Sequence, residues 1–435
     1  MAAGRANYAP LTDSSDCLYT SGLPPHPPGG VRPIFQLDLF RLRDFRCLVA
    51  SMLLNSVGMM GEVVVLGWLS LELTNSPFLV GVAMGMRALP LFFVGAPAGA
   101  LADRFSRRRL LMVTGLGQTL TASTLGVLTL LGLVGFGHLL LLTLVAGTLR
   151  GLEHAARQSY THDVVGAPAL LKGLAVLGIG MRSGWLLGSL GAGAVIAHFG
   201  SGAAYLAVAL GFLAGGLALL PASREVPHAS PNGESVWKSV LGFATTVRTD
   251  SNLLTLMVLT AGAEVLGFSH QALRPSLARD VLRTGPEGLG ALNAARSVGG
   301  ILGLVVASGR GFAWGGGALF VSVLLAFGAS LIVLGLAPGL VGLAGVFVVL
   351  VAVNAAGALA DLLAQSLLQL SMPGHLRGRA GGAWVVAIGL APLGQLQIGA
   401  LASLLGVSIA LGTSGLALVL LAGGTALLVP RVRRL

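Results

Sequence analysis

Twelve apolar runs, each long enough to cross a lipid bilayer, follow one another almost without interruption from Phe45 to Val429. A membrane-spanning helix needs about 20 largely apolar residues, because its backbone groups must pair within the segment itself. Turn-forming clusters such as TNSP (74–77) separate neighbouring runs. The sequence therefore predicts an all-α membrane protein with twelve transmembrane helices. The expected spans are Cys47–Leu73, Phe78–Ala102, Leu110–Val134, Leu139–Tyr160, Gly173–Ala197, Gly202–Leu220, Leu253–Pro275, Gly288–Ser308, Gly315–Leu336, Leu340–Ala364, Gly381–Leu404 and Val407–Leu428.

Only one internal stretch, PASREVPHASPNGESVWK (221–238), loses this hydrophobicity, and it divides the spans six and six. The sequence therefore predicts two six-helix bundles joined by a hydrated linker. Proline and glycine in the first residues, including LPPHPPGG, predict a disordered arm with a short interfacial stretch at its end. The expected parts are the arm (1–44), the first bundle (45–220), the linker (221–250), the second bundle (251–429) and a basic tail (430–435).

Lysine and arginine predict the orientation, because cytoplasmic loops retain these residues. Of the 27, twenty fall on the side that carries both ends of the chain, and four lie inside spans. Only Arg274, Arg279 and Arg283 fall on the other side. Both termini are therefore expected in the cytoplasm. The formal net charge of +11 then reflects topology, and we expect the bilayer as a partner and no nucleic acid.

The polar residues give little support to an enzyme. Charged residues make up 10% of the chain, and the two cysteines, Cys17 and Cys47, fit neither a disulfide nor a metal site. The sequence contains no nucleophile elbow, phosphate-binding loop or group of spaced metal ligands. We therefore expect neither catalysis nor a cofactor nor a metal ion.

The stretch GALADRFSRRR (99–109) places one acid and four arginines at the cytoplasmic end of the second span. It resembles the signature loop of the major facilitator superfamily, Gly-x-Leu-Ala-Asp-Arg-x-Gly-Arg-Arg, with Ser106 at the second glycine. The resemblance implies that Gly99 lets helices approach closely and that Asp103 accepts hydrogen bonds from the start of the eleventh span. It further implies a conformational latch on the cytoplasmic side. Its other expected members are Arg104 and Arg107, with Asp163 as a possible acidic partner.

Three further stretches resemble one branch of that superfamily, the drug and siderophore exporters typified by the enterobactin exporter and macrolide efflux proteins. The resemblance covers about residues 38–428 and implies alternating-access transport in a bacterial inner membrane. The stretches are ARQSYTHDVV (156–165), SLARDVLRTGPEGLGAL (276–292) and LLQLSMPGHLRGRAGG (367–382).

The two halves share a short internal repeat, Pro-x-x-x-Gly-x-x-x-x-x-Arg, which begins at Pro77 and again at Pro286. Each copy ends in an arginine inside a span, and the preceding span carries a glutamate at similar depth. Charge inside a membrane is costly and normally paired, so we expect Glu62 to pair with Arg87 and Glu264 with Arg296. Two roles stay open for these pairs. They carry protons or contact substrate, or they only hold two helices together.

The fourth span contains RGLEHAAR, which spaces Arg150, Glu153, His154 and Arg157 so that they are expected along one helix face. Arg150 falls near mid-membrane, and a glutamate beside a histidine can hold or pass a proton. We expect a function for Arg150. For Arg157 we favour a structural bridge to Glu153, one turn earlier.

The fifth span carries a ladder of glycines at spacing four, Gly180, Gly184 and Gly188, as in packed membrane helices. It resembles an antiporter motif, but Ser189 stands where that motif has proline. Arg182, within the same segment, has no partner that the sequence identifies.

The sequence therefore predicts a proton-coupled secondary active transporter that exports a lipophilic or amphipathic small molecule by alternating access. We expect a monomer. Three alternatives remain: an importer, a lipid or lysolipid transporter of the same fold, and a transport-inactive membrane receptor or scaffold.

Overall fold

The computed structural model describes residues 37–166, 169–222, 251–309, 316–370 and 389–431, and within these ranges it does not describe the side chains of residues 37–38, 91–92, 94–104, 171, 308–309 and 369–370. Apart from Leu37, the described residues all belong to one compact unit, Asp38–Leu435. Throughout the described ranges the regular elements are helices, with no strand. This agrees with the all-α fold that the apolar runs predict.

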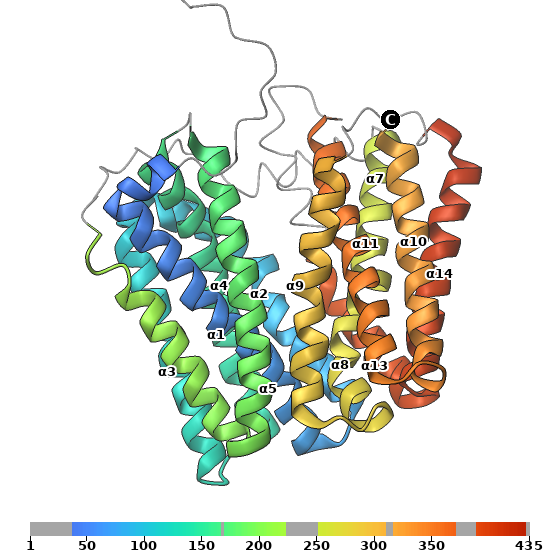
Figure 1. Ribbon diagram of the computed structural model, residues 1–435, viewed down its shortest axis with the longest axis horizontal. Coiled ribbons are helices and arrows are strands. Elements are labelled where there is room, and N and C mark those ends of the chain that lie inside the picture. The colour runs from blue at the N-terminus through green and yellow to red at the C-terminus, as the bar shows by residue number, and fades with distance from the viewer. Residues whose placement is uncertain (1–36, 167–168, 223–250, 310–315, 371–388, 432–435) are drawn as a thin grey trace, which may run out of the picture. The chain divides into compact units, whose positions relative to one another are not determined.

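The first half of the chain forms the helices that the first six spans predict (Figure 1). The fifth and sixth spans form the long helix α5, which is broken at Gly200, where φ is 81° and ψ is 171°. Only glycine adopts this backbone conformation at low cost. The break between the two spans that HFGSG predicts is therefore made at its first glycine, Gly200. The elements are η1 (Leu37–Arg41), α1 (Arg43–Thr74), α2 (Pro77–Arg104), α3 (Arg107–Leu130), α4 (Phe136–Val165) and α5 (Leu170–Leu217).

The second half begins with an irregular seventh span, in which α-helical, π-helical and 3-10 pieces follow one another as far as Val281. The sequence predicts that this span ends at Pro275, but helical structure continues to Val281. Arg274 and Arg279 therefore belong to helical structure and not to an external loop. The elements are α7 (Ser251–Gly262), η3 (Ala263–Gly267), η4 (Phe268–Leu273), α8 (Arg274–Ser276), η5 (Leu277–Val281), α9 (Gly285–Gly309), α10 (Gly316–Leu336), η6 (Ala337–Gly339), α11 (Gly342–Leu370), α13 (Ala391–Leu405) and α14 (Val407–Leu428).

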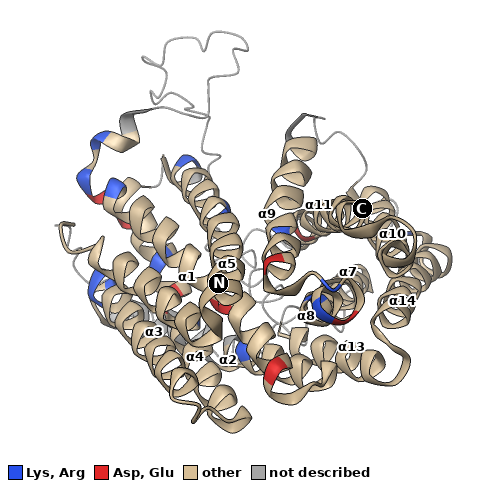
Figure 2. Ribbon diagram, turned by 60° about the horizontal axis from the view of Figure 1, so that its bottom comes forward, with Lys and Arg blue, Asp and Glu red and all other residues tan. Residues whose placement is uncertain are grey.

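Each expected span overlaps helical structure of the described residues, the eleventh only from Ala391 onward because residues 371–388 lie outside them. By length and composition, nine helical segments in these ranges qualify as membrane spans, and two shorter ones, Pro77–Pro90 and Ala391–Leu405, are equally apolar. The segment Lys172–Leu217 counts once among the nine although it is 46 residues long, enough for two spans. The described residues therefore form an all-helical, multi-pass membrane fold that is consistent with twelve spans, and charged residues are sparse along its helices (Figure 2).

Local sequence explains how the first helices end and begin. Asn75 ends α1 in the left-handed conformation, with φ at 50°, which asparagine tolerates better than most residues. Ser106, which replaces a glycine of the resembled loop, caps α3 because its hydroxyl accepts a hydrogen bond from the Arg109 N–H. The loop that separates α2 from α3 is therefore defined by a cap that the family signature does not include.

Glycines let α1 lie directly against α5. A side chain at Gly184 or Gly188 would collide with the backbone of α1 at Leu53 or Val57. Gly61 of α1 lies against Val208 of α5 in the same way. The glycine ladder thus serves helix packing, and it fixes which face of α1 is left for α2 and α4.

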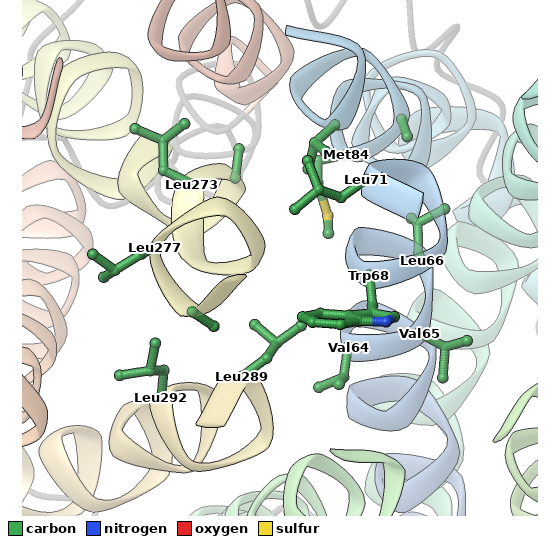
Figure 3. Close-up of a cluster of buried hydrophobic side chains, with 14 of the residues drawn as sticks. Val64, Val65, Leu66, Trp68, Leu71, Met84, Leu273, Leu277, Leu289 and Leu292 are labelled. Carbon is green, nitrogen blue, oxygen red and sulfur yellow. The ribbon is translucent and has the colours of Figure 1, made fainter. Parts of the chain in front are cut away.

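Both copies of the internal repeat place their glycine at a contact between the two halves. Gly81 of α2 lies against the backbone carbonyl of Gln395 in α13, and Gly290 of α9 lies against the backbone of α5 at Gly193. Next to these contacts, one buried apolar cluster combines Val64, Trp68 and Leu71 of α1 with side chains of the second half (Figure 3). The labelled partners in that half are Leu273, Leu277, Leu289 and Leu292.

Candidate functional site

The most distinctive polar group of the first half is a carboxylate held by two arginines from two other helices. Glu62 lies in the interior of α1, Arg87 in α2 and Arg150 near the middle of α4. Glu62 Oε2 forms an ion pair with Arg150 Nη2, and it lies 3.7 Å from Arg87 Nε. The side chains are 7% exposed for Glu62, 19% for Arg87 and 17% for Arg150. We call these three residues the Glu62 triad.

The packing of α1 explains why Glu62 faces these arginines. Gly58 and Gly61 lie against Phe212 and Val208, so this side of α1 is covered by α5. The next residue along a helix is turned by about 100° from its predecessor. Glu62 therefore points away from α5, toward α2 and α4. The predicted pair between Glu62 and Arg87 is present, and Arg150 is an additional member that spacing along α4 did not reveal.

The triad leaves positive charge and hydrogen-bond donors unmatched. One carboxylate faces two guanidinium groups, so the ionised triad carries a net charge of +1. Among the described residues, Arg87 Nε, Arg150 Nε and Arg150 Nη1 are buried nitrogen atoms without a hydrogen-bond partner. Buried polar groups in folded proteins are nearly always bonded, so three such donors at one site call for an explanation.

In a second charged cluster, which lies on α4, both carboxylate oxygens of Glu153 accept hydrogen bonds from neighbouring side chains. Arg157 donates to Glu153 Oε1 from Nε at 2.9 Å and from Nη2 at 2.6 Å. Gln118 of α3 donates to the other carboxylate oxygen at 3.4 Å, and Arg157 also reaches the hydroxyl of Ser51 in α1 at 3.4 Å. The structural bridge expected between Glu153 and Arg157 is confirmed. It ties together three helices.

The expectation that His154 shares this helix face is wrong. His154 is exposed, and its ring lies 3.1 Å from the side-chain amide of Gln158. Neighbouring residues of a helix differ by about 100° in direction, so His154 cannot point where Glu153 points. Arg150 lies on the triad side, which separates the predicted cluster into two groups.

Glu264 and Arg296, the second predicted pair, interact electrostatically, but no hydrogen bond or ion pair joins these two described residues. Arg296 Nη1 donates to Gln271 Oε1 at 2.7 Å, and its guanidinium lies 4.7 Å from the ring centre of Trp185 in α5. Glu264 falls in the π-helical turn η3. It lines a cavity of about 10 Å³, close to the space one water needs, and Asp361 of α11 lines the same cavity.

Sequence reasoning missed the most deeply buried cation. Arg274 is 2% exposed and donates to Asn293 Oδ1 at 2.9 Å and Asn354 Oδ1 at 3.2 Å. Its third contact is His270 Nε2 at 3.1 Å. All three partners are neutral acceptors when His270 carries its proton on Nδ1, which faces the Gly267 carbonyl at 2.8 Å. The two asparagines inside apolar spans were the signal that sequence analysis left unused.

The structure describes the side chains of only some of the remaining predicted residues. Arg107 forms a 2.5 Å ion pair with Asp163, as the resemblance suggested. Arg182 lies with its guanidinium against Gly300 of α9, and no hydrogen bond joins it to another described residue. The side chains of Gly99, Asp103 and Arg104 and the start of the eleventh span lie outside the described residues. Within the described ranges, no group of histidine, cysteine and acidic residues is arranged to hold a metal ion.

Comparison with known proteins identifies the family of this chain. A family model described as "Transmembrane secretion effector" matches residues 36–435. A search of curated protein sequences found no match. Solved structures share the fold at low sequence identity, which supports no conclusion about cargo.

Three of these structures are transporters. A bacterial homolog of the human lysosomal transporter Spinster, in an inward-facing and unoccupied conformation, is 14% identical, with 93% of this chain and 97% of that chain covered and a TM-score of 0.64. The nucleoside transporter NupG is 12% identical, with 88% and 99% covered and a TM-score of 0.73. The peptide transporter POT bound to alafosfalin is 15% identical, with 92% and 95% covered and a TM-score of 0.74. Because the family model spans nearly the whole chain, the protein belongs to the transmembrane secretion effector family of the major facilitator superfamily, whose members are multi-pass membrane transporters.

Proposed function

We propose that this transporter exports a lipophilic or amphipathic small molecule and is energised by protons, with Glu62 as the coupling residue. One observation carries the proposal. Glu62 is a carboxylate in the interior of a membrane span, 5% exposed, and two guanidinium groups from two other helices hold it. A charged side chain at such a depth costs several kcal/mol, so it is functional by default.

The triad offers a direct link between a proton and helix movement. Ionised Glu62 holds Arg87 of α2 and Arg150 of α4 against α1. A proton on Glu62 removes the charge that attracts both arginines, so α2 and α4 are then free to shift relative to α1. Loss of the proton restores the contacts. Rocking of the two halves around a central site converts this local change into alternating access.

Two considerations support export over the alternatives. The matching family is described as a secretion effector, and three stretches of the chain resemble drug and siderophore exporters. An importer and a lysolipid transporter of the same fold remain the second candidates. A receptor or scaffold that does not transport has no use for a buried carboxylate that exchanges protons. We place the protein as a monomer in a bacterial inner membrane, with both termini in the cytoplasm.

Transport in proteoliposomes tests the proposal. Purified protein is reconstituted, a pH gradient is imposed, and a panel of fluorescent dyes and lysolipids is followed across the membrane. The parent protein should move at least one probe uphill. Glu62→Gln should lose this pH-driven accumulation and keep downhill flux, because the neutral amide mimics protonated Glu62.

Glu153→Gln is the matched control, since it neutralises another buried glutamate that is held by an arginine. It should retain pH-driven transport. If Glu62→Gln accumulates probe like the parent while Glu153→Gln does not, the proton site lies in the cluster of Glu153 and Arg157. Equal, undiminished accumulation by both variants rules out a coupling role for either acid.

The cytoplasmic latch is a separate part of the proposal. We propose that Asp103 receives the start of the eleventh span when the cytoplasmic side closes, with Gly99, Arg104 and Arg107 around it. Asp103→Asn should then keep the fold and shift the population toward the cytoplasm-open state, because only the closed state contains the contact. Spin-label distances across the cytoplasmic face measure this shift. Unchanged distances would leave the loop with a role in topology alone.

A further inference from the structure

The membrane-buried part of the described chain contains more arginines than acids. Six arginines and four acids lie in the spans away from the helix ends, which gives an excess of two positive charges when all are ionised. The arginines are Arg87, Arg150, Arg157, Arg182, Arg274 and Arg296, and the acids are Glu62, Glu153, Glu264 and Asp361. A positively charged interior repels a cation that enters it and attracts an anion or the negative end of a dipole.

Both excess charges lie in the first half, where one belongs to the Glu62 triad and the other to Arg182 of α5. Glu153 and Arg157 compensate each other, and the cluster they form uses both carboxylate oxygens. The triad instead combines one carboxylate with two guanidinium groups and keeps three unbonded buried donors on Arg87 and Arg150. A buried donor without an acceptor costs about 1–3 kcal/mol, so an oxygen atom that reaches these donors is stabilised there.

We infer that the cargo of the proposed transporter carries no positive charge and meets Arg87 and Arg150 with an oxygen atom that accepts hydrogen bonds. This inference deepens the proposed function and rests on it, because it takes the Glu62 triad as part of the transport site. A carbonyl, carboxylate or phosphoryl oxygen meets the requirement. A lipophilic ammonium ion does not, since it offers no acceptor and adds a charge of the wrong sign.

The second half shows which acceptors suffice for a buried arginine in this protein. Arg274 donates to the amide oxygens of Asn293 and Asn354, although its Nε has no partner, and Arg296 donates to the amide oxygen of Gln271, at distances of 2.7–3.2 Å. None of these acceptors carries a formal charge. The protein therefore stabilises buried guanidinium groups with neutral carbonyl oxygens, and a cargo with an amide, ester or lactone group presents the same chemistry to the triad.

Equilibrium binding of three matched probes tests the inference. Each probe has a dansyl group on an undecyl chain, which ends in a carboxylate, a primary amide or a trimethylammonium group. Binding to detergent-purified protein is followed by dansyl fluorescence at constant pH. The carboxylate and the amide should bind, and the trimethylammonium probe should bind at least about tenfold more weakly, as expected for the loss of one charge-assisted hydrogen bond.

Variants of the triad separate the two possible kinds of cargo. Arg150→Gln should weaken the carboxylate and amide probes by about tenfold, and Arg150→Lys should restore part of that loss because it keeps a charged donor. Glu62→Gln should strengthen binding of the carboxylate probe, because it raises the net charge of the ionised triad from +1 to +2. A cationic cargo predicts the opposite pattern, in which Glu62→Gln removes binding and Arg150→Gln does not.

The probe series on the parent protein needs no variant and decides the question if Arg150→Gln fails to fold. Tightest binding of the trimethylammonium probe would overturn the inference, and so would equal binding of all three. Because no pH gradient is imposed, the result is independent of proton coupling. A protein that prefers the carboxylate or amide probe but lacks pH-driven transport would keep this inference and lose the proposed coupling.

Discussion

The two halves of the molecule stabilise their buried arginines in different ways. In the first half, Arg87 and Arg150 share the carboxylate of Glu62, and Arg157 is bonded twice to Glu153. In the second half, Arg274 is bonded to two asparagines and a histidine, and Arg296 to a glutamine. Glu264 also belongs to the second half, and it lines a small cavity together with Asp361.

This difference shows that the internal repeat preserves backbone contacts more faithfully than polar chemistry. Gly81 and Gly290 make equivalent approaches to the opposite half, whereas the arginines six residues later in each copy meet a glutamate and a glutamine. Paired charges suit a site that changes its protonation state. Neutral acceptors suit a site that keeps one charge state through the transport cycle. The first half is therefore the better candidate for coupling.

The largest expected effect compares the loss of an arginine in each half. Arg157→Met strands the buried carboxylate of Glu153 and should lower the free energy of unfolding by about 3–5 kcal/mol. Arg274→Met fills most of the same volume and leaves neutral amides unbonded, so it should cost about 1–3 kcal/mol. Thermal unfolding in detergent measures both. Equal losses would show that the two halves do not differ in the way their contacts suggest.

A smaller effect is expected when the second half is given the carboxylate that it lacks. Gln271→Glu places an acid 2.7 Å from Arg296 Nη1 and turns a neutral hydrogen bond into an ion pair. A hydrogen bond between charged groups exceeds a neutral one by about 1 kcal/mol, so stability should rise by roughly that amount. The same unfolding experiment detects the change, with Gln365→Glu in α11 as a contrast that places an acid beside Asp361 instead of an arginine and should lower stability. A loss of stability in Gln271→Glu would mean that desolvation outweighs the new pair.

The smallest effect is expected at His154. Its ring is exposed and belongs to neither the Glu62 triad nor the cluster of Glu153 and Arg157. His154→Gln should therefore change unfolding free energy by less than about 0.5 kcal/mol and leave the pH dependence of transport unaltered. A shifted pH profile would show that this histidine takes part in proton transfer and that the first half contains a larger coupling site than the triad.

The fold was predictable because the bilayer imposes a length and a composition on each helix. The apolar runs are enough to place the described helices, and Gly200 lies in the break that HFGSG predicts. The pair of Glu62 and Arg87 was predictable for a similar reason, since a charge inside a membrane needs a partner at the same depth.

The rest of the site depends on directions around helix axes that spacing does not give. Spacing identifies residues that share a face of α4, but it does not reveal that Arg150 meets α1. No pattern in AEVLG announces the π-helical turn that contains Glu264. Arg274 was placed outside the membrane because Pro275 suggests the end of a span, although the irregular helix continues to Val281.

The glycine contacts between the halves affect how easily the protein can move. At Gly81 and Gly290, and at their counterparts Gly399 and Gly193, one helix touches the other through backbone atoms. Such surfaces have no interlocking side chains, so sliding of α2 along α13, or of α9 along α5, requires no change of rotamer in either helix at these points. This is the geometry of a shear motion, in which packed helices are displaced by small steps and keep their own conformations. The tight packing at these four positions thus lets the helices slide past each other without rearranging side chains. The same close approach excludes any residue larger than glycine at these positions.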